Sequence, residues 1–188
     1  TKGGAIFATE GETTITQTSL INCTFTNNEG EDGGGAVYVA RGSGANTLNI
    51  INSSFTNNKH IGTSGDGDVI WAENFDVSQF GALCVNIDNS IIWNDGTTIF
   101  NVEEANTRTE ICVSSSILKD DVENGTVVFP ADVLDGGNNL DADPIFLRAG
   151  IGDLRVAKCS PALDVGNNLL TAAVDRDLVG SKRIFNIT

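Results

Sequence analysis

Two aspartates have the spacing that could support hydrolysis of a glycosidic bond. Asp95 and Asp121 end two similar segments of the chain, and Asn28 and Asn58 end two earlier ones. If these segments stack as parallel strands, the two carboxyl groups would stand about 5 Å apart, as in retaining glycosidases. Because the sequence fixes no third polar group beside them, we favour their interpretation as solvated turn residues that end a strand.

A polysaccharide lyase would instead need a basic residue among calcium-binding carboxylates on one exposed face. Lys119, beside Asp120 and Asp121, is the nearest approach to that arrangement. The chain holds 11 basic residues and one histidine, His60, which leaves few groups for acid–base chemistry. We therefore predict no catalytic residue here, and keep a fragment of a polysaccharide lyase or glycoside hydrolase as an alternative.

Aromatic side chains recur in the glycine-rich parts of the sequence and could form a strip on which sugar rings stack. The candidates are Tyr38, Trp71 and Phe100, with Trp93 as a further member. The two-residue period of a strand does not say which of its faces points inward. Stacked aromatic rings also fill protein interiors, so we favour core packing and keep the sugar platform open.

Neither the acidic residues nor the cysteines predict a metal site or a cofactor. Candidate calcium ligands lack the spacing of an EF-hand or a calcium-binding nonapeptide, and Asp143-Pro144 is typical of a turn. Cys84 and Cys112 should lie on adjacent strands two residues out of register, about 8 Å apart and slightly beyond disulfide reach unless the register shifts. We expect Cys23 to be a buried thiol. The calcium candidates are Asp66, Asp68, Asp141, Asp143 and Asp153, and the remaining cysteine is Cys159.

An internal repeat predicts the elements that position these residues. Residues 21–28 (INCTFTNN) match 51–58 (INSSFTNN), and residues 3–7 (GGAIF) match 34–38 (GGAVY). Weaker copies follow at 89–95 and 115–121. Stacking the four copies gives six columns of like residues: Thr18, Leu48, Val85 and Ile111; Leu20, Ile50, Ile87 and Val113; Cys23, Ser53, Ser90 and Ser116; Phe25, Phe55, Ile92 and Leu118; Ile6, Val37, Ile70 and Ile99; and Phe7, Tyr38, Trp71 and Phe100.

The columns alternate with polar residues in period two, which predicts short strands. One register break in each copy predicts a bend, where asparagine tolerates the left-handed conformation. We also expect stacked asparagines at this bend to hydrogen-bond to one another along the axis. The bend residues are Asn22, Asn52, Asn89 and Ser115.

Such a repeat cannot bury its apolar face alone, so we predict coils stacked around one shared core. The expected fold is all-β: a right-handed, single-stranded parallel β-helix, that is, a pectin-lyase-like solenoid. We predict one domain over residues 1–188, with clear repeats in 1–121, looser C-terminal coils in 122–188, and loops at 62–67 and 77–81. The chain reads as a piece of a longer protein.

Composition restricts the partners. The net charge of −14 would repel nucleic acids and anionic membranes, and no apolar run is long enough to cross a bilayer. Cations, neutral glycans and basic protein surfaces remain possible partners. Acidity also keeps a protein with exposed strands soluble, which is the interpretation that we favour.

The order of motifs resembles that of exported bacterial β-helix proteins. The glycine-rich opening followed by Asn-x-Ser/Thr-Phe-x-x-Asn resembles the repeats of polymorphic outer-membrane-type adhesins. Later motifs resemble the choice-of-anchor Q proteins, which are frequent in Bacteroidota, although Cys159 stands where that family usually has glycine. The later motifs are NSIIWN (89–94), NNLDADPIF (138–146), GDLRV (152–156), SPALDVG (160–166) and DRDLVGSKRI (175–184).

This resemblance implies a secreted or outer-surface protein. We expect a non-catalytic role in adhesion, with glycans or another surface protein as partners. A third alternative is a structural subunit that stacks end to end into a fibre through open strand edges.

Overall fold

The computed structural model describes most of the chain and shows an all-β protein. The described residues are 2–9, 15–42, 44–63, 69–75, 81–94, 99–104, 109–119, 129, 133–171 and 174–183. Much of each predicted insertion loop, residues 64–67 and 77–80, lies outside them. In the described part, no helix is long and apolar enough to cross a membrane.

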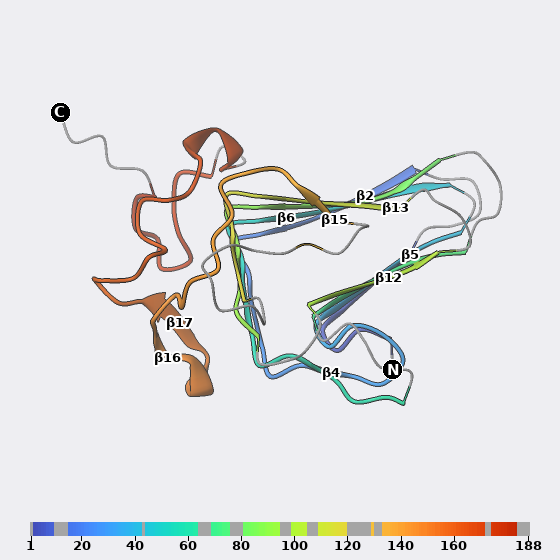
Figure 1. Ribbon diagram of the computed structural model, residues 1–188, viewed down its shortest axis with the longest axis horizontal. Coiled ribbons are helices and arrows are strands. Elements are labelled where there is room, and N and C mark those ends of the chain that lie inside the picture. The colour runs from blue at the N-terminus through green and yellow to red at the C-terminus, as the bar shows by residue number, and fades with distance from the viewer. Residues whose placement is uncertain are drawn as a thin grey trace.

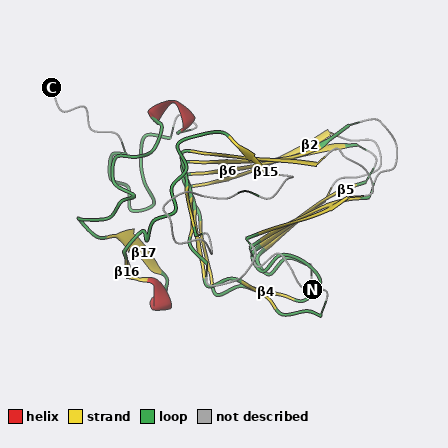
Figure 2. Ribbon diagram, in the orientation of Figure 1, coloured by secondary structure: helices red, strands yellow, loops and turns green. Residues whose placement is uncertain are grey.

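Three parallel sheets surround a shared interior (Figure 1; Figure 2). Each sheet takes one strand from each successive repeat. Sheet A has the order β1 (Ile6–Thr9), β5 (Val37–Arg41), β9 (Ile70–Asn74), β12 (Phe100–Glu104). Sheet B has the order β15 (Val133–Asp135), β13 (Thr109–Ser114), β10 (Leu83–Asp88), β6 (Ala45–Ile51), β2 (Ile15–Ile21). Sheet C has the order β14 (Ile117–Leu118), β11 (Ile91–Ile92), β7 (Ser54–Thr56), β3 (Thr24–Thr26).

The pairing registers confirm the predicted columns of sheets B and C. Leu48 lies between Thr18 and Val85, and Phe55 lies between Phe25 and Ile92. The rings of Phe25 and Phe55 stack with centroids 4.6 Å apart. Like residues lie over like residues because a parallel, in-register pair places equal positions of successive repeats side by side.

The predicted register of the last strand of sheet A is wrong by one residue. Phe100, rather than Ile99, lies opposite Ile70, and Asn101 lies opposite Trp71. The Ile99 carbonyl accepts hydrogen bonds from the amides of residues 69 and 70, as the Val69 carbonyl does from residues 36 and 37. Ile99 is therefore equivalent to Val69, and Phe100 enters the core.

The predicted bends are confirmed by their backbone conformation. Asn22, Asn52, Asn89 and Ser115 all have φ between 50° and 55°, in the left-handed region. Beside each bend the next repeat satisfies a backbone amide: the N–H groups of Cys23, Ser53 and Ser90 each donate to the next serine Oγ at 3.1 Å. Asn139 Oδ1 ends this serine ladder by accepting from Ser116 N.

The asparagine ladder lies in a different column from the one predicted. Asn28 and Asn58 donate through their backbone N–H groups to Asn58 Oδ1 and Asn94 Oδ1 respectively, at 3.2 and 2.6 Å. These residues follow a second bend, at Asn27 and Asn57, which are also left-handed. The side chains of the first-bend asparagines instead bind the C-terminal part of the chain.

The described residues of 141–183, a range here called the C-terminal segment, lie beside the outer face of sheet C (Figure 1). The parallel stack continues to Leu140, which bridges to Ile117. The segment then forms an antiparallel hairpin of β16 (Phe146–Arg148) and β17 (Asp153–Val156), joined by η1 (Ala149–Ile151), and later a short helix, η2 (Asn168–Leu170). A small parallel sheet of β4 (Glu29–Gly30) and β8 (Lys59–His60) lies outside the three main sheets.

Candidate functional site

The predicted pair of aspartates does not follow the asparagine column. Asn94, not Asp95, extends that column, because Asn94 Nδ2 also donates to the Asn58 carbonyl at 2.7 Å. The third repeat is one residue shorter than the second between the serine column and the asparagine column. It lacks an equivalent of the left-handed Asn57, since neither Trp93 nor Asn94 takes that conformation. Asp95, Asp120 and Asp121 themselves lie outside the described residues.

Tyr38, Trp71 and Phe100 do not form the aromatic strip that is the alternative to core packing, because they face opposite sides of sheet A. Phe100 packs into the shared core, which confirms core packing for that residue. Tyr38 and Trp71 face away from the core, yet they are only 1% and 5% exposed and pack in a separate cluster. They are therefore not available as a platform for sugars.

A polar cluster covers Tyr38. Its hydroxyl donates to Glu73 Oε2, and Lys2 Nζ donates to the Tyr38 hydroxyl at 2.9 Å. Burial, followed by the bond to Glu73, raises the pKa of Tyr38 far above its usual value. The phenol therefore stays protonated at physiological pH and cannot act as a base.

Cys84 and Cys112 lie on adjacent strands, as the sequence predicts. Cys84 lies opposite Glu110, and Cys112 lies opposite Asn86, so the two thiols are two residues out of register. Both thiols are free, and burial raises the pKa of each. The expectation that Cys23 is buried is wrong: it lies in the first described repeat and is partly exposed.

The calcium candidates are engaged in other ways or lie outside the described residues. Asp143 Oδ1 accepts from Ile145 N at 2.8 Å, which confirms the predicted turn. Asp153 is bound by arginines, while Asp66 and Asp68 fall outside the described part. Among the residues that the structure describes, no group of three or more His, Cys, Asp or Glu side chains is arranged to hold a metal ion.

The bend asparagines attach the C-terminal segment to the stack. Asn22 Nδ2 donates to the Arg176 carbonyl at 2.8 Å, and Asn52 Nδ2 donates to the Thr171 carbonyl at 3.3 Å. Asn89 both donates to the carbonyl and accepts from the amide of Asn167. One column of the repeat thus binds successive points of a segment that has no repeat of its own.

This docking leaves a cleft of about 600 Å³, here called the arginine cleft, between the segment and sheet C. Sheet C and its bend contribute hydroxyl and amide groups, and the segment contributes charged and apolar side chains. Its lining residues are Thr24, Asn52, Ser54, Gly152, Asp153, Leu154, Arg155, Val156, Asp177, Leu178, Val179 and Arg183.

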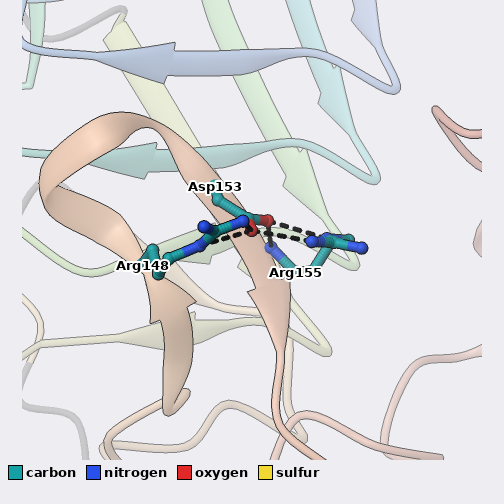
Figure 3. Close-up of polar contacts among 3 residues, drawn as sticks. All are labelled: Arg148, Asp153 and Arg155. Atoms are coloured by element: carbon teal, nitrogen blue, oxygen red, sulfur yellow. Dashed lines mark hydrogen bonds and ion pairs between the residues drawn. The ribbon is translucent and has the colours of Figure 1, made fainter.

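Two arginines hold the Asp153 carboxylate at this cleft (Figure 3). Arg155 donates to it from Nε and Nη2, both at 2.8 Å, and Arg148 donates from Nη2 at 3.1 Å. These bonds, with that of Arg155 the strongest cause, hold the pKa of Asp153 well below its usual range. Asp153 is therefore ionised and is not a proton donor at neutral pH.

Arg183 supplies the second cationic side chain of the arginine cleft. Its Nη2 donates to Asn22 Oδ1, and burial lowers its pKa from the usual value, an effect that Asp177 opposes. Its Nε is buried and has no hydrogen-bond partner in the described structure.

A second cleft, of about 310 Å³, surrounds Trp93 and is here called the tryptophan cleft. Lys119 Nζ lies 5.7 Å from the centroid of the Trp93 ring. Ile145 has φ of 50°, a conformation that is unfavourable for a β-branched residue and is concentrated at functional sites. The lining residues are Thr56, Asn57, Trp93, Asp143, Ile145, Phe146 and Ala149.

The carboxylates that line the two clefts are engaged within the C-terminal segment, and Asp177 Oδ1 accepts from the amides of Val179 and Ser181. In the described linings, Asp143 is hydrogen-bonded to its own turn and Asp153 is neutralised by arginines. Comparison with protein-family models, curated proteins and solved structures finds no match to this chain. Sequence reasoning identified Trp93 as a candidate, but it missed both clefts, since their walls come from segments distant in the sequence.

Proposed function

We propose that this chain is a right-handed parallel β-helix of an exported bacterial protein that binds saccharides at the cell surface without cleaving them. The observation that carries this proposal is the tryptophan cleft. An aromatic ring there lies among a hydroxyl, an amide and a carboxylate, from Thr56, Asn57 and Asp143. Aromatic rings pack against the apolar faces of sugars, and such polar groups bind their hydroxyls.

The arrangement of strands supports the β-helix. Each of the three parallel sheets is ordered by repeat, and the interior side chains of all three join one core. The resemblance to choice-of-anchor Q proteins and outer-membrane-type adhesins supports the extracellular location. The net charge of −14 favours neutral saccharides over strongly anionic polymers.

A glycan array probed with the wild-type chain and with Trp93→Ala tests the proposal. We expect neutral oligosaccharides to bind the wild type, and Trp93→Ala to weaken binding about tenfold or more through loss of the aromatic contact. Phe75→Ala is the control, because Phe75 is an aromatic residue that is 53% exposed and does not line the cleft. Equal binding by both variants would refute the tryptophan cleft as the site.

The non-catalytic part of the proposal has its own assay. Neutral and acidic polysaccharides are incubated with the protein and analysed for new reducing ends and for unsaturated products. We expect every polysaccharide to remain intact. Release of either kind of product would favour the lyase or hydrolase alternative.

A specific observation also favours end-to-end assembly as a second candidate function. Strand β2 is an edge of sheet B, carries no charged residue, and exposes 85% of Ile15. Uncharged strand edges can pair with another chain. Light scattering over a range of concentrations should then show growing species, whereas a monomer at every concentration would exclude assembly.

A further inference from the structure

The C-terminal segment carries no net charge, whereas the rest of the chain is strongly acidic. Six of the 11 basic residues and six of the 25 acidic residues lie in 141–183. The rest of the chain holds the other five basic and 19 acidic residues, a net charge of −14. The arginine cleft thus lies on the least acidic part of an acidic protein.

From this cleft we infer a second ligand site, which binds a sugar acid: one carboxylate-bearing unit within an otherwise neutral glycan. Arg155 uses Nε and Nη2 to hold Asp153, which orients its guanidinium group at the cleft. Arg183 lines the same cleft, and its buried Nε lacks an acceptor in the described structure. Guanidinium groups are well suited to carboxylates because they present paired N–H donors.

The opposite wall suits the neutral part of such a ligand. Thr24 and Ser54 present hydroxyl side chains to the cleft from the outer face of sheet C. Hydroxyl groups donate and accept hydrogen bonds, as the hydroxyls of a sugar ring require. The cleft volume of about 600 Å³ lies within the range of small-ligand sites.

The same cleft disfavours a polyanion. Asp153 and Asp177 also line it, and the rest of the chain is strongly acidic. A ligand with a carboxylate on every unit would meet these charges, whereas a single carboxylate among neutral units can contact the arginines alone.

Calorimetry with two matched oligosaccharides tests this site. The probes are xylotriose bearing one glucuronic acid, and xylotetraose as the neutral control. We expect the acidic probe to bind about tenfold more tightly, because a charge-assisted hydrogen bond is stronger than a neutral one. The preference should diminish as salt is raised, since salt screens exposed charges.

Two arginine variants identify the residue responsible. Arg148 and Arg155 both bind Asp153, but only Arg155 lines the cleft. Arg155→Gln should remove the preference for the acidic probe, and Arg148→Gln should retain it. Equal effects of the two variants, or tighter binding of polygalacturonate than of the singly charged probe, would overturn the inference.

The inference rests on the proposed saccharide binding, and the results separate the two. If neither oligosaccharide binds, the sugar-acid site is refuted, and the glycan array alone decides the proposed function. If the two probes bind equally and Trp93→Ala abolishes binding, the proposed function stands and the sugar-acid site is refuted.

Discussion

Serine hydroxyl groups accept hydrogen bonds from backbone amides at the bends of this protein. Ser90 is buried, and its Oγ accepts from Ser53 N at 3.1 Å and donates to the Asp88 carbonyl at 2.8 Å. The amide that follows each of the bends at Asn22, Asn52 and Asn89 donates to a serine Oγ of the next repeat instead of to a backbone carbonyl. The column is polar for this reason, although it adjoins the core.

Replacing Ser90 with alanine should lower the free energy of unfolding by about 1–3 kcal/mol, because the buried amide of Ser53 would lose its acceptor. Urea unfolding measures the change. Ser19→Ala is the control: Ser19 is exposed on the other face of sheet B, and its loss should change stability by no more than about 0.5 kcal/mol. Similar losses for both variants would contradict the role of the ladder.

The β16–β17 hairpin is an element held by charge rather than by burial. Asp153 binds arginines of both strands, and the side chains of Arg148 and Arg155 are mostly exposed. Of the residues in the two strands, only Leu154 is buried. The hairpin should therefore respond to pH more strongly than the three sheets do.

Lowering the pH should loosen the hairpin before the sheets unfold. The pKa of Asp153 is depressed in the folded chain, so the unfolded chain binds more protons below about pH 4. The stabilisation is complete above that pH and is lost as the pH falls through the depressed value. Hydrogen exchange at the β16 and β17 amides, measured from pH 6 to pH 2, should show this loss after correction for intrinsic exchange rates.

Asp153→Asn is the control for this pH effect. An amide does not titrate, so the exchange of the variant hairpin should be raised at pH 6 and should change little further on acidification. A pH dependence identical to that of the wild type would assign the effect to another carboxylate.

At the scale of the whole molecule, three sheets share one core and should unfold together. Phe55 is 0% exposed, stacks on Phe25 and pairs with Ile92 in the next repeat. Phe55→Ala should lower the free energy of unfolding by about 3–5 kcal/mol through the cavity that it leaves. Phe75→Ala, at an exposed site, is the control.

Tryptophan fluorescence can test whether this loss is global. Trp71 lies in sheet A and Trp93 lies beside sheet C, so Trp71→Phe and Trp93→Phe each leave one reporter. In the Phe55→Ala background, both reporters should show one coincident transition at a lower urea concentration. Separate midpoints would mean that the sheets unfold independently.

The sequence by itself determined the repeat, the strands, their parallel pairing and the bends. Leu48 over Thr18, Phe55 over Phe25 and the left-handed Asn22 and Asn52 all follow from residue types at a near-constant offset. This works because stacked repeats give equal positions equal surroundings, so each position selects the same kind of side chain.

Only the tertiary structure decided the face of Trp71, the register of Phe100 and the position of the C-terminal segment. Ile99-Phe100 has the same apolar pattern as Ile70-Trp71, so periodicity could not distinguish two registers that differ by one residue. Both clefts join sheet C to residues about 50 to 160 positions away in the chain. Such long-range contacts depend on how the C-terminal segment packs against sheet C. A local pattern of residues does not encode that packing.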